Sequence, residues 1–257
     1  VYSPDERTIC LTGKDEIAVE MAVLEFLERY VGVRWLLPGR DWEVVPVADS
    51  LSIPRQDIRQ SAAFYSRCLS LGRGRPYKGR MDKVRALAMA TVEERETEDF
   101  GVAIQRFCYR HRLVDRMAFH HNLFNLFPPE VYARKMPEVF PILEGKRHIP
   151  GAGREARLGW QPCMTHPKVI SEAVKNISRY LEENPDKSSY SLGPNDGGGF
   201  CTCDTCRALT AVKSGMPDFS RLYFQWATQV VEGVAKRFPH VRFGTLAYGA
   251  AMDVPEG

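Results

Sequence analysis

The chain has 257 residues, of which 44% are hydrophobic, 11% aromatic and 26% charged. This composition is typical of a folded globular protein and excludes intrinsic disorder, which needs fewer apolar residues and a larger net charge. The 35 lysines and arginines nearly balance the 32 aspartates and glutamates, so the net charge of +3 indicates no nucleic-acid partner. No run approaches the roughly 18 apolar residues that a membrane-spanning helix needs.

The first 60 residues predict a small α/β unit. Residues 7–11 are strand-like, and Asp15 is placed to cap a helix over residues 15–30, in which apolar side chains recur at helical spacing. Gly32 stands where a glycine ends helices, and a strand over residues 33–37 follows. A polar, proline-containing passage leads to a second domain. We therefore predict one domain over residues 1–57 and another over residues 58–257.

The second domain alternates predicted strands and helices. Strands are expected at residues 64–71, 116–119, 189–193 and 241–248, and helices at residues 98–112, 169–180 and 219–234. This alternation predicts parallel βαβ units, built into a doubly wound sheet or a (β/α)8 barrel. No glycine-rich nucleotide motif follows the first strand, which favours the barrel. The predicted fold class is α/β: a partial (β/α)8 TIM barrel preceded by part of a small α/β domain.

The ends of the chain indicate a piece of a longer protein. The first residues, Val-Tyr-Ser-Pro-Asp, contain no basic start followed by an apolar signal segment. Both ends adjoin strand-like runs, and the predicted strands make up about half a barrel. We therefore expect further strands outside the sequence, and the composition leaves the cellular location open.

Asn195 and Asp196 precede three glycines at residues 197–199. Glycines permit unusual backbone angles and let a ligand approach the main chain, here at Gly197 and Gly198. A carboxylate in such a place can act as a general acid or base if its pKa is raised. The alternative is a tight turn without function, because these residue types favour turns.

Three of the seven cysteines lie within six residues, at Cys201, Cys203 and Cys206. Thiolates at this spacing suit a tetrahedral Zn²⁺, with Cys163 as the predicted fourth ligand and His166 as the second choice. A disulfide and free thiols are the alternatives. A zinc ion held in this way would be structural, because four cysteine ligands leave no position open for a substrate. No cofactor for catalysis is predicted.

Four further side chains are candidates for binding a sugar. His120 and His121 end a predicted strand, Trp160 lies beside a glutamine, and Tyr248 ends the last predicted strand. Imidazole and hydroxyl groups bond sugar hydroxyls, and aromatic rings pack on the apolar face of a sugar ring. The alternative is a structural role within the core.

Several strings together resemble a known family. Near the beginning they match the end of the small domain that precedes the barrel in α-glucuronidases and β-hexosaminidases: Phe26-Leu27-Glu28-Arg29, Gly32-Val33-Arg34-Trp35-Leu36 and Pro38-Gly39. The later strings resemble the domain-of-unknown-function 4838 family: His121, Pro128-Pro129, Tyr132, Pro137-Glu138, Phe140, Gly145-Lys146-Arg147, Gln161-Pro162-Cys163, Pro167 and Ser191 to Cys206 with Arg207-Ala208-Leu209.

The resemblance implies a TIM-barrel glycoside hydrolase similar to glycoside hydrolase family 163. Such an enzyme is an exported endo-β-N-acetylglucosaminidase that cuts the core of complex N-glycans with retention, often with the acetamido oxygen of the substrate as nucleophile. Its partner would be a glycan or a glycoprotein. Asp196 and Asn195 would serve catalysis and His121 and Tyr248 would line the sugar site, with the second carboxylate here or beyond Gly257. An α-glucuronidase-like polysaccharide hydrolase and a non-catalytic glycan-binding barrel are the alternatives.

Overall fold

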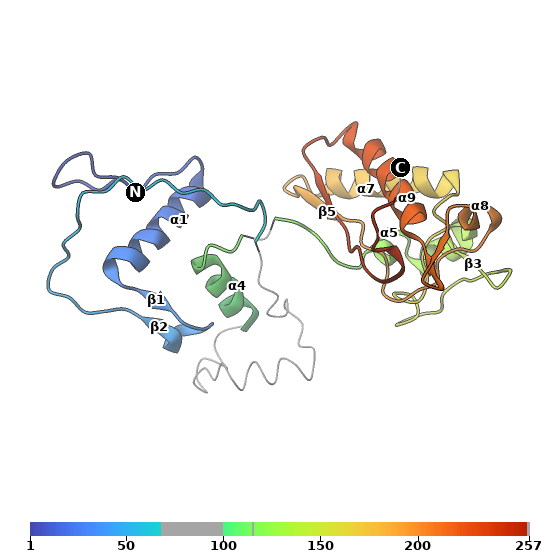
Figure 1. Ribbon diagram of the computed structural model, residues 1–257, viewed down its shortest axis with the longest axis horizontal. Coiled ribbons are helices and arrows are strands. Elements are labelled where there is room, and N and C mark those ends of the chain that lie inside the picture. Colours follow the sequence, from blue (N-terminus) through green and yellow to red (C-terminus); the bar gives the residue numbers. More distant parts are fainter. Residues whose placement is uncertain (68–99, 115, 256–257) are drawn as a thin grey trace. The chain divides into compact units, whose positions relative to one another are not determined.

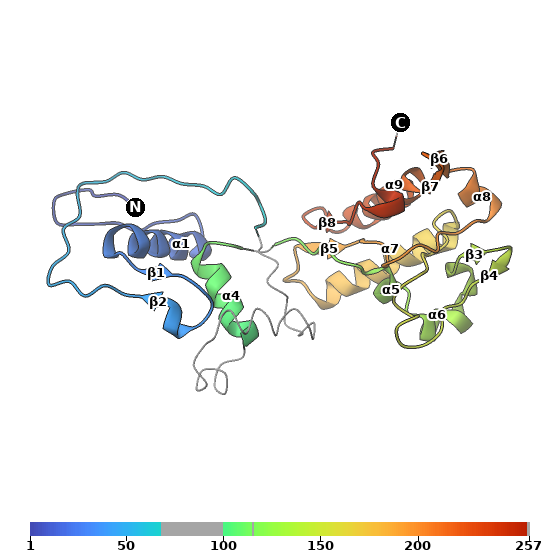
Figure 2. The same cartoon turned by 60° about the horizontal axis from the view of Figure 1, so that its bottom comes forward.

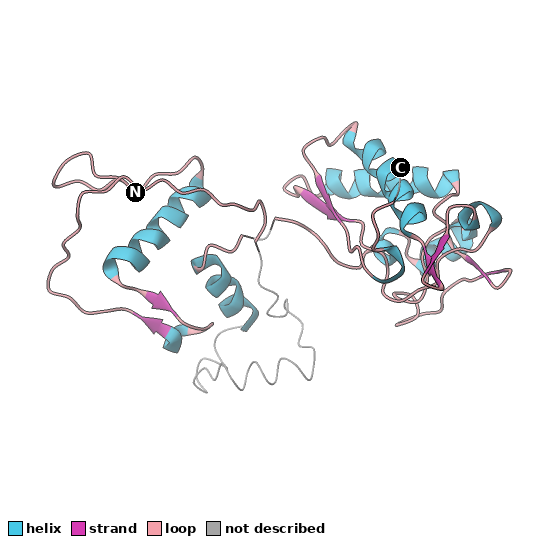
Figure 3. Cartoon of the chain, viewed as in Figure 1, coloured by secondary structure: helices cyan, strands magenta, loops and turns pink. Residues whose placement is uncertain are grey.

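The computed structural model describes residues 1–67, 100–114 and 116–255 (Figure 1). The chain divides into two compact units, Val1–Arg116 and Met117–Gly257. In both units helices are the longer elements (Figure 3). Each strand in the described ranges has two or three residues. The domain boundary expected after residue 57 is not the same as this division into compact units, and it stays a prediction.

The main helix of the first unit begins and ends where the sequence predicts. Helix α1 spans Glu16–Phe26 and continues as a π-helical turn over Leu27–Val31. The Asp15 carboxylate accepts a hydrogen bond from the backbone N–H of Ala18 at 2.8 Å, so it caps the helix N-terminus. The chain leaves the helix at Gly32, whose φ of 83° is left-handed.

The strands of the first unit differ from the prediction. Strand β1 covers only Arg34–Trp35 and pairs antiparallel with β2 at Glu43–Val44 after a 3₁₀ turn at Arg40–Trp42.

Helix α4 at Phe100–Arg110 confirms the helix predicted over residues 98–112. The predicted strand over residues 64–71 is absent at residues 64–67, and its remaining residues lie outside the described part.

The predicted strand at residues 7–11 is wrong. Cys10 makes only an isolated bridge, to Tyr2. Just before it, the Asp5 carboxylate accepts hydrogen bonds from the Arg7 backbone N–H at 2.7 Å and the Thr8 hydroxyl at 2.9 Å. Such local bonds favour a turn over a strand, because they occupy backbone groups that a sheet would need.

Two long helices form much of the core of the second unit. Helices α7, Pro167–Glu183, and α9, Ser220–Ala235, pack side by side (Figure 2). Both were predicted from the helical spacing of apolar residues, and most of those residues are buried: Val169, Ala173 and Ile177 from α7, and Leu222, Tyr223, Trp226, Val230 and Val234 from α9. Tyr180 of the predicted set is exposed, and Leu181 beside it is buried instead.

One βαβ crossover is present in the second unit. Strand β5, Ser189–Ser191, pairs parallel with β8, Arg242–Gly244, and α9 lies between them in the chain. The segment predicted as a strand at residues 116–119 lies outside any strand. It continues to His121, which makes a parallel bridge to Gly193. The described residues contain no closed barrel, so the partial (β/α)8 barrel stays a prediction.

The short elements of this unit were not predicted. Helices α5, α6 and α8 cover Leu123–Leu126, Pro129–Lys135 and Asp204–Arg207, and 3₁₀ turns lie at Pro137–Val139 and Gly249–Ala251. Two hairpins join β3, Ile142–Leu143, to β4, Lys146–Arg147, and β6, Ala211–Lys213, to β7, Met216–Asp218. Both hairpins turn at two residues with positive φ, Glu144-Gly145 and Ser214-Gly215, as a type I′ hairpin turn requires.

None of the helices in the described ranges is both long and apolar enough to cross a membrane.

Candidate functional site

Two segments of the second unit run side by side and support the candidate site. Leu158 bridges in parallel to Asp196, the Gly159 N–H donates to the Asp196 carbonyl at 2.8 Å, and the Gln161 N–H donates to the Gly199 carbonyl at 2.9 Å. Residues 195–199, here called the glycine loop, are therefore held along residues 158–161. Nothing in the local sequence of either segment predicts this pairing, because the two are more than 30 residues apart.

Gln161 anchors the glycine loop. Its side chain is fully buried, and its amide nitrogen donates to the Asn195 carbonyl at 2.8 Å while its amide oxygen accepts from the Asn195 N–H at 3.0 Å. Both backbone groups of Asn195 are thus satisfied by one side chain, as buried polar groups require.

The side chain of Asn195 is also used inside the protein. Its oxygen accepts from the Phe124 N–H at 2.7 Å, its nitrogen donates to the Trp160 carbonyl at 2.9 Å, and the residue is 1% exposed. In this arrangement Asn195 positions the loop, and its side chain does not reach a ligand at the surface.

The glycines of the loop have different roles. Gly199 has a φ of 77°, and a Cβ there would lie 2.1 Å from the Gly159 carbonyl oxygen, so no larger residue fits between the two segments. Gly197 and Gly198 are exposed beside Asp196. The loop therefore presents the Asp196 carboxylate at the surface, while the C-terminal end of the loop, at Gly199, is fixed against residues 159–161.

Asp196, Tyr248 and His121 form a group, here called the Asp196 group. The Tyr248 hydroxyl and the Gly197 N–H each donate to Asp196 Oδ1 at 3.0 Å. His121 Nε2 lies 3.9 Å from the same oxygen, and the rings of His121 and Tyr248 are 5.7 Å apart. His121 Nδ1 is 2.6 Å from the Pro194 carbonyl, which can only accept, so Nδ1 carries a proton.

These contacts set the charge of the carboxylate. The hydrogen bonds from Tyr248 and Gly197 lower the pKa of Asp196, with a smaller contribution from the nearby imidazole. Partial burial and the neighbouring carboxylate raise the pKa of Tyr248 to about 12. At neutral pH the pair is therefore a carboxylate and a neutral phenol. A carboxyl that donates a proton needs a raised pKa, so this geometry suits Asp196 as a hydrogen-bond acceptor.

Trp160 lies in the core. It is fully buried, its ring packs against Phe140 at 5.3 Å between centroids, and its Nε1 lies 3.2 Å from the Ala156 carbonyl. The ring is therefore covered and cannot stack on a sugar in this structure. Trp160 has the structural role in the core that was the alternative from the sequence.

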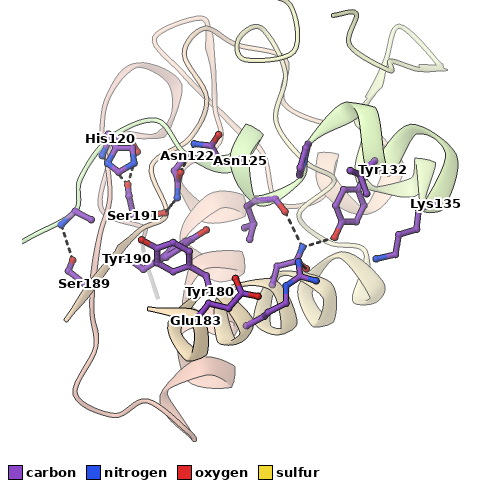
Figure 4. A pocket seen from close by; sticks show the side chains of 16 residues that line it. His120, Asn122, Asn125, Tyr132, Lys135, Tyr180, Glu183, Ser189, Tyr190 and Ser191 are labelled. Atoms are coloured by element: carbon purple, nitrogen blue, oxygen red, sulfur yellow. Dashed lines mark hydrogen bonds between the residues drawn. The ribbon is translucent and has the colours of Figure 1, made fainter. Parts of the chain in front are cut away.

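His120 faces a different place from His121. It lines a cavity of about 560 Å³ bounded by α6, α7, β5 and residues 118–128. Figure 4 shows His120 and Asn122 toward one side of this cavity and Tyr132 and Lys135 toward the other. The Asp196 group does not line the cavity. The side chains of the two adjacent histidines therefore lie in different places: His120 lines the cavity, and His121 belongs to the Asp196 group.

Four cysteines converge in the second unit. They form the four-cysteine cluster, whose sulfur atoms all lie within 4.8 Å of one another: Cys163, Cys201, Cys203 and Cys206. The Cys163 sulfur is 3.9 Å from that of Cys203 and 4.0 Å from that of Cys206. None of the four forms a disulfide, and only Cys203 is more than slightly exposed. The structure thus brings together the four predicted ligands, while His166 lies outside the cluster.

Hydrogen bonds reach the cluster from two residues that the sequence did not single out. The Ile142 N–H donates to the Cys201 sulfur at 3.2 Å, and the Thr165 hydroxyl lies 3.1 Å from the Cys206 sulfur. Hydrogen bonds from Cys163 and Cys206 lower the pKa of Cys201, and the same sharing of protons raises the pKa of Cys163 to about 12. The four sulfur atoms lie close enough together to hold a soft divalent cation.

The chain belongs to the family described as "Domain of unknown function (DUF4838)", whose model matches residues 37–257. This confirms the resemblance to that family. A search of curated proteins and a search of solved structures each found no match. The relation to glycoside hydrolase family 163, the N-terminal domain type and the site residues stay predictions.

Proposed function

We propose that this chain is part of a retaining glycoside hydrolase that acts on N-acetylglucosamine-containing glycans, with Asp196 in its sugar site. One observation carries the proposal. An ionised, exposed carboxylate on a glycine loop is held by the hydroxyl of Tyr248, beside the ring of His121. A carboxylate, a phenol and an imidazole are groups that bond sugar hydroxyls and amides, and the two rings can pack on apolar sugar faces.

The lowered pKa of Asp196 favours a role as hydrogen-bond acceptor over a role as the acid that protonates the leaving group. In a substrate-assisted reaction, the acetamido oxygen attacks the anomeric carbon as the glycosidic bond breaks. Positive charge then develops on the acetamide, and an ionised carboxylate that accepts its N–H stabilises that charge. We assign Asp196 this acceptor role. The acid that protonates the leaving oxygen is a separate group.

A second candidate is a glycan-binding protein without hydrolysis. It is favoured by the exposure of the Asp196 side chain, which is 66% accessible, since a catalytic carboxyl usually works in a site that excludes water. Both candidates use the same three side chains, and they differ only in whether the bound glycan is cut.

The test uses the intact protein and a glycoprotein that carries complex N-glycans. Mass spectrometry detects released glycan, and calorimetry measures binding. We expect Asp196→Asn to lower the rate by roughly 100-fold or more, as losses of transition-state charge stabilisation do. The matched control is Asp186→Asn, which changes an exposed aspartate that pairs with Lys187.

The outcomes separate the candidates. Cleavage by the native protein and its loss only in Asp196→Asn support the hydrolase. Binding without cleavage, weakened by Asp196→Asn, supports the glycan-binding protein. Full cleavage by Asp196→Asn, or neither binding nor cleavage by the native protein, contradicts the proposal.

A further inference from the structure

We propose that the four-cysteine cluster binds one Zn²⁺ through all four thiolates, and that this ion fixes the path of the chain that follows the glycine loop. The proposal rests on the convergence of four sulfur atoms from two distant segments and is independent of any activity on glycans.

The spacing of the sulfur atoms fits one tetrahedral ion. Four sulfurs, each about 2.3 Å from a central zinc, form a tetrahedron whose edges are about 3.8 Å. The separations of 3.9 Å and 4.0 Å from Cys163 to Cys203 and Cys206 are close to that edge. A disulfide needs its sulfurs at about 2.05 Å, roughly half of these distances. The separations from Cys163 therefore fit a shared small ion and not a disulfide.

The donor atoms select the metal. The cluster contains only cysteine sulfur, and soft thiolates favour zinc over magnesium or calcium, which prefer oxygen. Four thiolates complete a tetrahedral shell and leave no site for water or substrate, as in structural zinc sites. The N–H of Ile142 and the hydroxyl of Thr165, both within hydrogen-bond distance of a sulfur, are the outer contacts that orient such ligands.

The ion would join two segments that are distant in the chain. Cys163 precedes α7. Cys201 follows the glycine loop, Cys203 immediately precedes α8, and Cys206 lies in α8, a helix of only four residues. So short a helix is not stable by itself. Thr202 and Cys201 are in turn bonded to Ile142 of β3. One zinc would thus fix α8, β3 and the chain that leads from Asp196.

The test measures metal in the full chain purified without chelator. Elemental analysis should give about one zinc per chain. Cys201→Ser and Cys206→Ser should lose it, while the matched control Cys10→Ser, a cysteine of the first unit, should retain it. Replacement of zinc by cobalt(II) should produce the visible absorption of a tetrahedral thiolate site.

Two readouts that need no substrate test the structural role. The cluster thiols should resist alkylation until a chelator is added, without any reductant. Removal of the metal should speed amide hydrogen exchange in residues 200–207 by at least tenfold and leave exchange in α1 unchanged. A metal-free protein whose cluster thiols react at once, labelling that requires a reductant, iron in place of zinc, or unchanged exchange after metal removal would each overturn the proposal.

Discussion

Gln161 is the residue whose replacement tests the packing of the candidate site most directly. Gln161→Leu keeps the volume but removes the amide that satisfies both backbone groups of buried Asn195. Each unpaired buried group costs about 1–3 kcal/mol, so the loss in the free energy of unfolding should be about 2–6 kcal/mol. For a chain of this size that lowers the melting temperature by roughly 5–20 °C.

The assay is thermal unfolding of the full chain, followed by circular dichroism and by calorimetry. Gln225→Leu is the matched control, because Gln225 lies exposed on α9 and its replacement should change stability by less than about 0.5 kcal/mol. If Gln161→Leu melts at the temperature of this control, the anchoring role of Gln161 is refuted.

Two further predictions concern the Asp196 group and the contact between the long helices. Tyr248→Phe removes the largest cause of the lowered pKa of Asp196, so the pKa should rise toward its ordinary value in a carbon-13 NMR titration. Because folding lowers this pKa, the carboxylate stabilises the fold at neutral pH, and the contribution disappears as the pH falls through the folded-state pKa. An unchanged titration would contradict the assignment. Gly233→Ala places a Cβ 2.6 Å from the stiff Val174 side chain and should cost about 1–3 kcal/mol in denaturant unfolding, although alanine usually favours helices. The same substitution in a Val174→Ala background should cost nothing, and an equal cost there would refute the clash.

The sequence predicted those features that depend on neighbours in the chain. The apolar spacing in α7 and α9 and the cap at Asp15 follow from contacts three or four residues apart, which a linear pattern records. The three clustered cysteines were visible for the same reason. The hairpins at Glu144-Gly145 and Ser214-Gly215 were missed, although their glycines were a usable local signal.

The tertiary structure decided what each candidate residue can do. Trp160 and Asn195 are residue types that often occur in sugar-binding sites, but contacts with residues distant in the sequence bury both. Asp196 and Tyr248 are 52 residues apart, and the hydrogen bond from the Tyr248 hydroxyl to Asp196 Oδ1 lowers the pKa of the carboxyl. Burial and pKa depend on atoms brought together through space, and for that physical reason the sequence could single out these residues, whereas only the folded chain shows their surroundings.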